Sequence, residues 1–304
     1  MPGPRNLVSP PTFVDRNFGL LSVVQARYDE PDAHWRNGVT FSDLCGLAGT
    51  TYDPICVSGT AAPAKASNVT LQKFGAEPFT VFGEFDCSPV GYSQQERAAL
   101  ATDALTRNES WQVERTFWTG AVAGVGSTVY SVNPHLAANE AVLDTAGIQL
   151  QCAATPVSGS VVMDVDEGLG RLEAAMSNCT NGQFVIHVPM ILGEALFDHH
   201  VVDIYGGQIK TRAGNLVALG AGYTGSGPDG TFIPNAAWVY ATAQVFAYRS
   251  RPETFTYKEM INRTNNTLQS IVERTYVLGF PCCCFFAVPI SVGGDVTGLP
   301  LSAV

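Results

Sequence analysis

Three consecutive cysteines, Cys282–Cys284, are the residues of this chain that most directly suggest chemistry. A zinc site uses pairs such as Cys-x-x-Cys, because the intervening residues turn the chain so that both sulfur atoms face one ion. The chain has no such pair, and neighbouring side chains on an extended strand point to opposite faces. Free cysteine packs as a small hydrophobic residue, and the apolar stretch Phe285–Val288 follows at once. We therefore predict that Gly279–Val292 is a strand buried on both faces, with its cysteines packed in the core; metal binding is the alternative.

A second group of metal-ligand residue types lies in the sequence FDHHVVD, which holds Asp198, His199, His200 and Asp203. On a strand His199 and Asp203 would share a face while His200 pointed away. Two ligands do not make a closed metal site. The pattern favours a loop facing solvent or an interface, with a metal-dependent enzyme that uses the His199 and His200 region as an alternative.

The stretch GAGYTG at Gly220–Gly225 matches the dinucleotide-binding fingerprint and follows a predicted strand. The next residues, SGPDGTF, cannot open the helix whose N-terminus would hold a pyrophosphate. We therefore expect a glycine-rich turn.

Nucleophile and phosphate-binding motifs are absent from the sequence: there is no Gly-x-Ser-x-Gly, no His-Glu-x-x-His and no P-loop. Cys179 precedes His187, but nothing in the sequence indicates that the two face each other. We predict no catalytic, cofactor-binding or metal-binding residues, and we expect that the protein is not an enzyme.

The composition suggests that much of the surface is covered by other subunits. Of 304 residues, 46% are hydrophobic and only 14% are charged, against about 25% charged in a typical soluble domain. The net charge of −10 argues against a protein that holds nucleic acid by its own positive field. It is compatible with a container that a motor fills with nucleic acid.

The first residues, MPGPRNLVSPPTF, lack the apolar core of a secretory signal, and no later segment has the length and apolarity of a membrane span. We therefore expect synthesis in a cytosol, where the eight cysteines stay reduced.

The elements that would position these residues begin with a proline-rich arm over residues 1–36, whose apolar patch Phe18–Val24 we expect to dock. Strands are predicted over Gly38–Leu44 and Pro78–Cys87, separated by about thirty residues without periodicity. The second strand alternates, with residues 79, 81, 85 and 87 on one face and 80, 84 and 86 on the other.

Two helices are predicted. The capping box Ser93–Glu96 starts a long helix that runs to about Trp118 and ends at Gly120. Its predicted buried residues are Leu100, Ala104, Trp111 and Trp118, and Asp103 is expected to pair with Arg107. The second helix covers Val165–Met176, with Asp164 as its cap and Leu169, Leu172 and Met176 as its buried stripe.

Further strands are predicted over residues 183–192, 215–223 and 237–250, which makes the chain a mixed α+β protein. In the third strand both faces are expected to be covered. One face carries Val239, Ala241, Ala243, Val245 and Ala247, and the other carries Trp238, Tyr240 and Thr242.

The order of these elements resembles the major capsid protein of tailed double-stranded DNA bacteriophages, of the type that infects actinobacteria; encapsulin shells share this fold. The resemblance rests on four segments, PFTVFGEFDCSPVG, ALTRNESWQVERTFWTG, AWVYATAQVFAYRS and ERTYVLGFPCCCFFAV.

The resemblance implies an N-terminal arm over residues 1–36 and an extended two-stranded loop over 37–88. A peripheral domain with the long spine helix would comprise residues 89–130 and 237–304, and an axial domain residues 131–236.

The implied function is that of a structural subunit of an icosahedral shell around a phage genome, made in the host cytoplasm and found in the virion. Its partners would be its own copies, as pentamers and hexamers, with a portal, a decoration protein and a separate scaffold as further candidates, since MPGPRN opens no helical scaffolding segment. The DNA would be enclosed without sequence-specific binding, and no membrane is involved. An encapsulin-like compartment is the alternative shell. Some members of the family cross-link Lys to Asn between subunits, and Lys65 and Lys73 lie in the implied loop.

Overall fold

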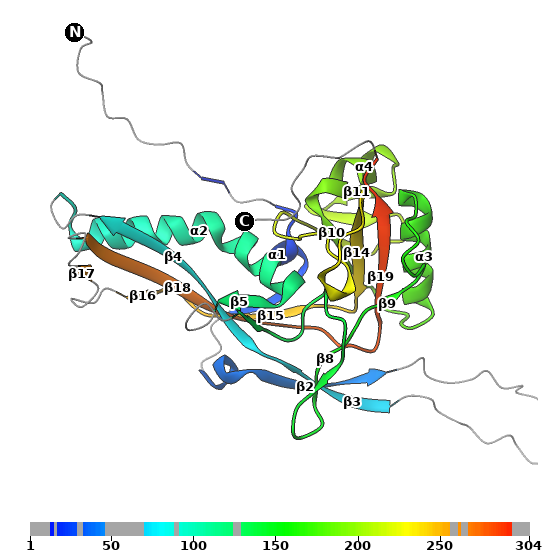
Figure 1. The fold of residues 1–304 in the computed structure, drawn as a ribbon, viewed down its shortest axis with the longest axis horizontal. Helices are drawn as coiled ribbons and strands as arrows, with labels where there is room; N and C mark the ends of the chain where they lie inside the picture. The colour runs from blue at the N-terminus through cyan, green and yellow to red at the C-terminus, as the bar shows by residue number, and fades with distance from the viewer. Residues whose placement is uncertain are drawn as a thin grey trace, which may run out of the picture.

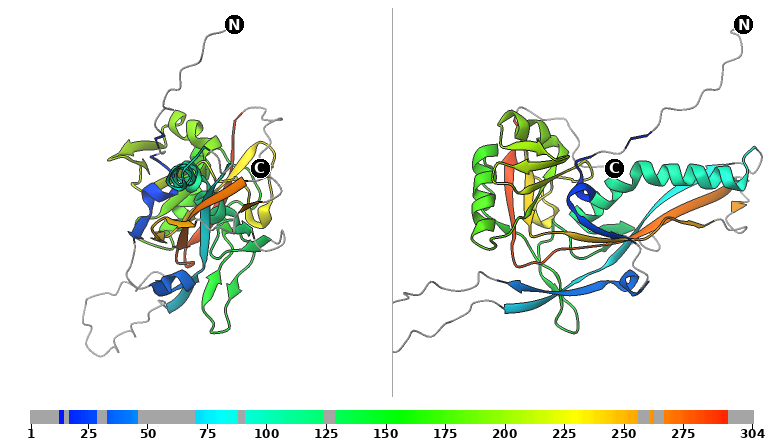
Figure 2. Two further views of the ribbon diagram at one scale, coloured as in Figure 1. Left: turned by 90° about the vertical axis from the view of Figure 1, so that its left-hand side faces the viewer. Right: turned by 180° about the vertical axis from the view of Figure 1, so that it is seen from behind.

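The computed structural model describes residues 13–14, 17–28, 33–45, 70–87, 91–123, 129–255, 261–262 and 267–293. The molecule is elongated, with a long helix and two long strands at one end and a sheet flanked by helices at the other (Figure 1). A two-stranded hairpin lies apart from both, as the views in Figure 2 show. In the described residues the strands form four sheets.

The long helix α2 spans Gln94–Thr119 and begins and ends as the sequence predicts. The Ser93 hydroxyl accepts a hydrogen bond from the Glu96 backbone, and the Glu96 carboxylate accepts one from the Ser93 backbone. The helix ends at Gly120, whose φ of 71° is a left-handed conformation that glycine adopts without a steric cost. These caps satisfy backbone groups at both ends of the helix.

A six-stranded sheet supports α2. Its members are β1 (Gln25–Tyr28), β15 (Phe246–Arg249), β18 (Thr267–Gly279), β16 (Glu253–Phe255), β17 (Ile261–Asn262) and β4 (Pro78–Cys87). β4 and β18 pair antiparallel along the whole of β4. The predicted alternation of β4 is confirmed, because its odd-numbered residues 79, 81 and 83 are buried while 80, 82, 84 and 86 are exposed. A Cβ at Gly83 would collide with the α2 backbone at Leu105, so glycine permits this close packing.

The predicted buried face of α2 is confirmed at Trp118 and wrong at Leu100 and Trp111, while Ala104 is half-buried. Leu100 and Trp111 are 36% and 38% exposed. The buried residues are Arg97, Ala101, Leu105, Glu109, Val113, Glu114, Phe117 and Trp118. The stripe was missed because three of its members are charged, and a hydrophobic pattern places charged residues in solvent. The predicted ion pair of Asp103 with Arg107 is present at 2.7 Å.

A seven-stranded sheet forms the other end of the molecule. Its order is β11 (Val202–Tyr205), β12 (Gln208–Thr211), β13 (Leu216–Gly220), β10 (Val185–Pro189), β14 (Ala236–Thr242), β19 (Phe285–Ser291) and β9 (Thr155–Pro156). Helix α3 (Val165–Ser177) packs against β19 and β14, and the short helix α4 (Gly193–Asp198) precedes β11. The predicted stripe of α3 is confirmed, since Leu169, Leu172 and Met176 are buried. Asp164 is its N-cap, although its side chain makes no capping hydrogen bond.

The strand predicted over residues 237–250 is two strands in two sheets. β14 ends at Thr242, and β15 begins at Phe246 in the six-stranded sheet. The break moves Val245 and Ala247 into the core under α2, whereas Val239 and Ala241 pack in the core under α3. The expectation that Val239 and Ala247 share one face is therefore wrong, because three residues outside both strands change the direction of the chain.

The separate hairpin belongs to a four-stranded sheet of order β2 (Val39–Cys45), β3 (Thr70–Ala76), β8 (Gln149–Gln151) and β7 (Val142–Leu143). The strand β3 was missed, because it lies within the stretch without periodicity. It pairs with β2 from Val39↔Ala76 to Cys45↔Thr70. The two predicted strands on either side of that stretch, β2 and β4, thus lie in different sheets.

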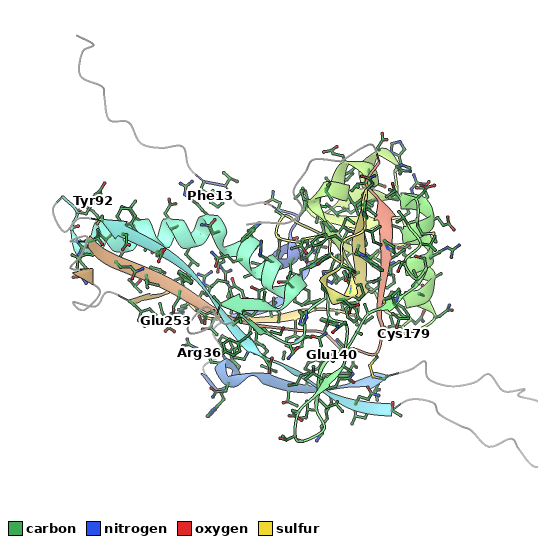
Figure 3. The ribbon with its side chains drawn as sticks, in the orientation of Figure 1. Phe13, Arg36, Tyr92, Glu140, Cys179 and Glu253 are labelled. Carbon is green, nitrogen blue, oxygen red and sulfur yellow. A yellow bond between two sulfur atoms is a disulfide. The ribbon has the colours of Figure 1, made fainter. Side chains whose placement is uncertain are left out.

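The N-terminal segment docks as expected. Helix α1 (Leu20–Val23) is buried against the core under α2, and β1 pairs in parallel with β15. A 3-10 helix, η1 (Ala33–Asn37), follows, and its Arg36 lies 2.6 Å from Glu253 of β16 (Figure 3). Two further 3-10 helices cover Met190–Leu192 and Pro228–Gly230, and β5 (Ala121–Ala123) pairs with β6 (Val129–Ser131). No helix in the described ranges has the length and apolarity to cross a membrane.

Candidate functional site

The spine helix α2 carries a buried carboxylate that joins it to the six-stranded sheet. Arg274 of β18 donates from Nη1 to both carboxylate oxygens of Glu109, at 2.7 and 2.9 Å. Arg249 of β15 donates from Nη2 at 2.9 Å, and the Tyr276 hydroxyl donates at 2.6 Å. A buried charge is stable only when it is paired and hydrogen-bonded, and this carboxylate is both. The cluster thus connects one helix to two strands, which is a structural task.

A second buried carboxylate, Glu114, joins the start of α1 and the turn after β13 to the same helix. It accepts a hydrogen bond from the Leu20 backbone at 3.0 Å and one from the Gly222 backbone at 2.9 Å. Gly222 lies in the stretch that resembles the dinucleotide fingerprint. A Cβ there would collide with the Trp111 carbonyl oxygen of α2, so glycine serves close packing at this position. The predicted glycine-rich turn is confirmed, because irregular chain and a short 3-10 helix follow β13.

His187 is fully buried in β10 between two hydroxyl groups. The Thr242 hydroxyl donates to the Ala243 carbonyl at 2.8 Å, so its oxygen accepts from Nε2–H of His187 at 2.9 Å. Nδ1 then accepts from the Tyr223 hydroxyl at 3.1 Å. Burial lowers the pKa of His187 to about 3. The pKa of Tyr223 is raised well above its usual value, mainly by burial and to a smaller extent by the negative charge of Glu114. His187 is therefore a neutral core residue.

Cys179 and His187 do not form a thiolate–imidazole pair. Cys179 follows the end of α3 and is joined to Cys284, whereas both ring nitrogens of His187 are engaged by Tyr223 and Thr242. The structure thus separates two residue types that nucleophilic catalysis would require in contact.

The predicted exposed loop in the FDHHVVD stretch is confirmed only at its two histidines, since the stretch begins in α4 and ends in β11. α4 ends at Asp198, and His199 and His200 form the turn before β11. His199 Nδ1 lies 3.3 Å from an Asp166 carboxylate oxygen on α3. Across the residues that the structure describes, no three His, Cys, Asp or Glu side chains are arranged to hold a metal ion.

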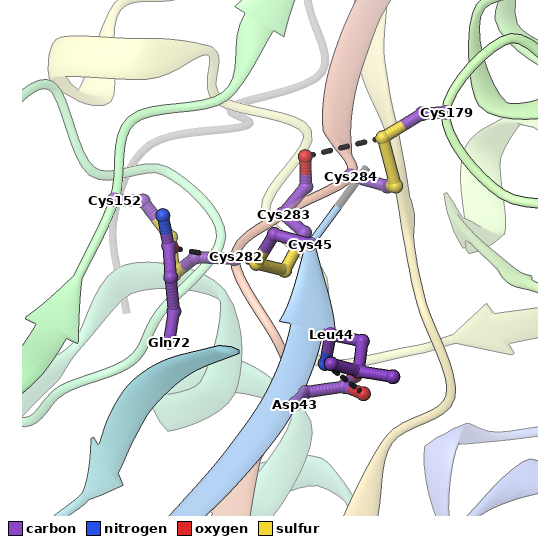
Figure 4. Close-up of a disulfide and its surroundings, with 9 residues drawn as sticks. All are labelled: Asp43, Leu44, Cys45, Gln72, Cys152, Cys179, Cys282, Cys283 and Cys284. Atoms are coloured by element: carbon purple, nitrogen blue, oxygen red, sulfur yellow. Dashed lines mark hydrogen bonds between the residues drawn. A yellow bond between two sulfur atoms is a disulfide. The ribbon is translucent and has the colours of Figure 1, made fainter. Parts of the chain in front are cut away.

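The three consecutive cysteines form disulfides, and this corrects the prediction of free thiols in a strand. Cys45, Cys152 and Cys179 pair with Cys283, Cys282 and Cys284, with Cα–Cα distances of 5.2, 6.0 and 5.7 Å (Figure 4). These distances lie within the normal range for a disulfide. The cysteines occupy a turn between β18 and β19, so all three side chains diverge toward different neighbours. Only the strand after the turn, Phe285–Ser291, is buried on both faces as predicted.

The pairing could not be read from the sequence, because eight cysteines joined in four pairs already allow 105 connectivities. The available signal was the even number of cysteines, eight in all, with three of them consecutive. We did not infer disulfides from it, because we expected the cysteines to stay reduced in a cytosol. We call the six residues Cys45, Cys152, Cys179 and Cys282–Cys284 the cysteine junction. Cys87, at the end of β4, is free.

Large apolar side chains are exposed on the hairpin and beside α2. Leu44 and Leu71 are register partners on β2 and β3, and they are 62% and 69% exposed. Phe82 on β4 and Trp111 on α2 line a groove that continues to Val122 of β5. Exposed apolar residues that cluster on extended elements are typical of surfaces that contact other protein chains.

Comparison with known proteins identifies the fold. No family model and no curated protein sequence matches the chain. Solved structures do match over almost the full length. A chain described as the capsid of a native GTA particle has a TM-score of 0.53 at 9% identity, covering 95% of both chains. A chain of Gordonia phage Cozz has a TM-score of 0.52 at 12% identity, covering 95% of this chain and 91% of the other.

A capsid chain of Ralstonia phage GP4 has a TM-score of 0.51 at 9% identity, covering 97% of both chains. At these identities the similarity establishes the fold. The mixed α+β architecture inferred from the sequence is confirmed, and it is the architecture of these phage and GTA capsid chains.

Proposed function

We propose that this chain is the major capsid protein of a tailed double-stranded DNA phage, a structural subunit that assembles with its own copies into an icosahedral shell. The observation that carries the proposal is the match to capsid chains over 95 to 97% of this chain. Because nearly the whole chain is covered, the match is not limited to one common substructure.

The surface properties support a subunit that is completed by its neighbours. The charged fraction is 14%, and Leu44 and Leu71 expose apolar area on a hairpin that stands apart from the core. An isolated molecule would leave this area in water at a cost of about 25 cal/mol per Å². Contacts between subunits remove that cost, which favours assembly.

The domain boundaries remain as proposed: an arm over 1–36, an extended loop over 37–88, a peripheral domain over 89–130 and 237–304, and an axial domain over 131–236. The strands β14 and β19 come from the peripheral range and pair in the sheet of the axial range. These two strands would join the domains into one rigid subunit.

The proposed partners are other copies, as pentamers and hexamers, with scaffold, portal and decoration proteins as separate chains. The net charge of −10 suits a wall that encloses DNA without holding it by sequence-specific contacts. Localisation in the virion follows from this function.

A structural role without catalysis is part of the proposal. The buried polar residues Glu109, Glu114 and His187 are engaged in contacts within the fold, and His199 and His200 lie in an exposed turn. An enzyme that uses His199 and His200 with a metal is the disfavoured alternative. Metal analysis of the purified protein tests it, because a stoichiometric metal would support the enzyme.

Electron microscopy and sedimentation of the expressed full chain test the proposal. We expect closed particles, or closed particles once the partner proteins are supplied. The charge-introducing variant Leu44→Asp should impair assembly while leaving the fold intact, and Ser160→Asp, in an exposed turn away from the hairpin and the groove, is a matched control for an added charge. A chain that sediments as a monomer under every condition would contradict the proposal. Phage DNA in purified native particles would distinguish a genome capsid from an encapsulin-like compartment.

A further inference from the structure

The cysteine junction lies where three sheets meet. β18 ends the six-stranded sheet at Gly279 and β19 starts in the seven-stranded sheet at Phe285, so Cys282–Cys284 occupy the crossover between them. Two cross-links reach the four-stranded sheet, because Cys45 ends β2 and Cys152 follows β8. The third cross-link reaches the end of α3. Closing these bonds therefore fixes three sheets and one helix relative to one turn (Figure 4).

The same arrangement suits the reduced state. The Cys45 sulfur lies 3.4 Å from Oε1 of Gln72, and the Cys179 sulfur lies 3.2 Å from the Cys283 carbonyl oxygen. A thiol at either position donates a hydrogen bond to that acceptor, which a disulfide sulfur cannot do. The fold therefore provides hydrogen-bond acceptors for the reduced thiols and also places the cysteines close enough to form disulfides. With Cα–Cα distances of 5.2 to 6.0 Å, conversion needs no backbone movement.

Small reagents have access to the junction. Cys179, Cys282 and Cys283 are partly exposed, one on each of the three cross-links. The reaction starts when one thiolate attacks a sulfur atom of the oxidant. One accessible thiol in each pair is therefore sufficient to start it.

We propose that the cysteine junction is a redox lock: the chain folds with six thiols in a reducing cytosol and closes three disulfides when it meets a low-molecular-weight disulfide such as oxidised glutathione. In each pair one thiolate attacks the oxidant, forms a mixed disulfide and releases one thiolate of the small molecule. The second cysteine thiolate attacks the cysteine sulfur of the mixed disulfide and releases the other. Each pair thus loses two electrons and two protons, and each oxidant molecule is reduced to two thiols.

The lock strengthens one subunit from within. Its bonds join residues 238, 130 and 105 positions apart, so they restrict the unfolded chain strongly and the folded chain little. The proposal concerns the fold of the single chain, so it does not rest on assembly into a shell.

Thiol alkylation with mass spectrometry tests the pairing in the purified full chain. The oxidised protein should have fewer alkylatable thiols than the reduced protein by six. Cys45→Ser or Cys283→Ser alone should leave one additional alkylatable thiol in the oxidised protein, and the double variant should return the count to that of the wild type. An unchanged count in the single variants would overturn the assigned pairing.

Unfolding in urea, in buffers of varied ratio of reduced to oxidised glutathione, tests the lock. We expect the midpoint to be higher in the oxidised protein by about 1 M or more, with unchanged far-ultraviolet circular dichroism before unfolding. Cys87→Ser is the matched control, since it removes a cysteine outside the junction that is free in the described part of the chain, and it should leave both midpoints unchanged. Equal midpoints in the two states, or loss of the folded spectrum on reduction, would overturn the proposal.

Discussion

The backbone N–H of Leu20 donates a hydrogen bond of 3.0 Å to the carboxylate of Glu114, a residue 94 positions later in the chain. The same carboxylate accepts the Gly222 N–H at 2.9 Å. One side chain of the spine helix thus holds the N-terminal segment and the turn after β13, and the relationship makes the helix the organising element of the fold.

We predict that Glu114→Gln destabilises the protein by about 1 to 3 kcal/mol, because an amide replaces one charged acceptor and leaves a buried N–H without its partner. Urea unfolding of the purified variant measures the change. Asp103→Asn is the control, since it removes a carboxylate from an exposed pair on the same helix and should cost less than about 1 kcal/mol. Equal effects of the two substitutions would contradict the assigned role.

Substitution of Glu109 should lower the stability of the protein more than substitution of Glu114. Glu109→Gln removes the carboxylate charge that Arg274 and Arg249 contact in a mostly buried cluster, so we expect a loss of about 3 to 5 kcal/mol. The double variant Glu109→Leu with Arg274→Met removes the charges of Glu109 and Arg274, leaves that of Arg249, and should recover part of that loss. Denaturant midpoints of the three proteins test this order, and a double variant less stable than the single one would refute it.

Stability should fall as the pH drops below about 6.5. The pKa of His187 is lowered to about 3 in the folded protein, so between about pH 6.5 and 3 only the unfolded chain takes up the proton. At about pH 4.5 this disfavours folding by roughly 2 to 3 kcal/mol relative to pH 7.

The variant His187→Gln lacks the titrating group, so its unfolding free energy should depend less steeply on pH over this range. Tyr223→Phe removes a hydrogen-bond partner of His187 and keeps the imidazole, so it should lose stability at every pH and retain the wild-type slope. Chemical denaturation at several pH values distinguishes the two variants. Identical slopes for wild type and His187→Gln would count against the prediction.

Two glycine substitutions should act in opposite directions. Gly222→Ala places a methyl group against the Trp111 carbonyl, so we expect destabilisation by about 1 to 3 kcal/mol from overpacking. Gly170→Ala lies in α3 with open space around the added methyl, so it should stabilise the protein by about 0.5 to 1 kcal/mol. Thermal unfolding of both variants measures the signs, and a shared sign would contradict the packing interpretation.

Sequence and structure agree where the determining signal is local. The capping box at Ser93, the left-handed residue Gly120 and the alternation of β4 each depend on residues within a few positions, and all three are present as predicted. The resemblance to phage capsid proteins also came from the sequence, since the order of elements and several diffuse segments suggest it. The structural comparisons confirm the fold.

Sequence and structure disagree where strand pairing and burial depend on contacts between residues that are distant in the chain. The partner of β2 is β3, which has no clear pattern of its own, and the buried face of α2 includes Glu109 and Glu114, which a hydrophobic pattern assigns to solvent. The contacts that Glu109 and Glu114 make inside the fold were missed for the same reason.

The sequence by itself determined the fold class, the spine helix and the low fraction of charged residues, because composition and local periodicity carry that information. Only the tertiary structure decided which cysteines meet, which carboxylates are buried and which strands pair. Each of these depends on which arginines, backbone N–H groups and thiols from distant parts of the chain lie close in the fold. A buried charge is stable only beside a partner, and a disulfide forms only between two cysteines that are close in space.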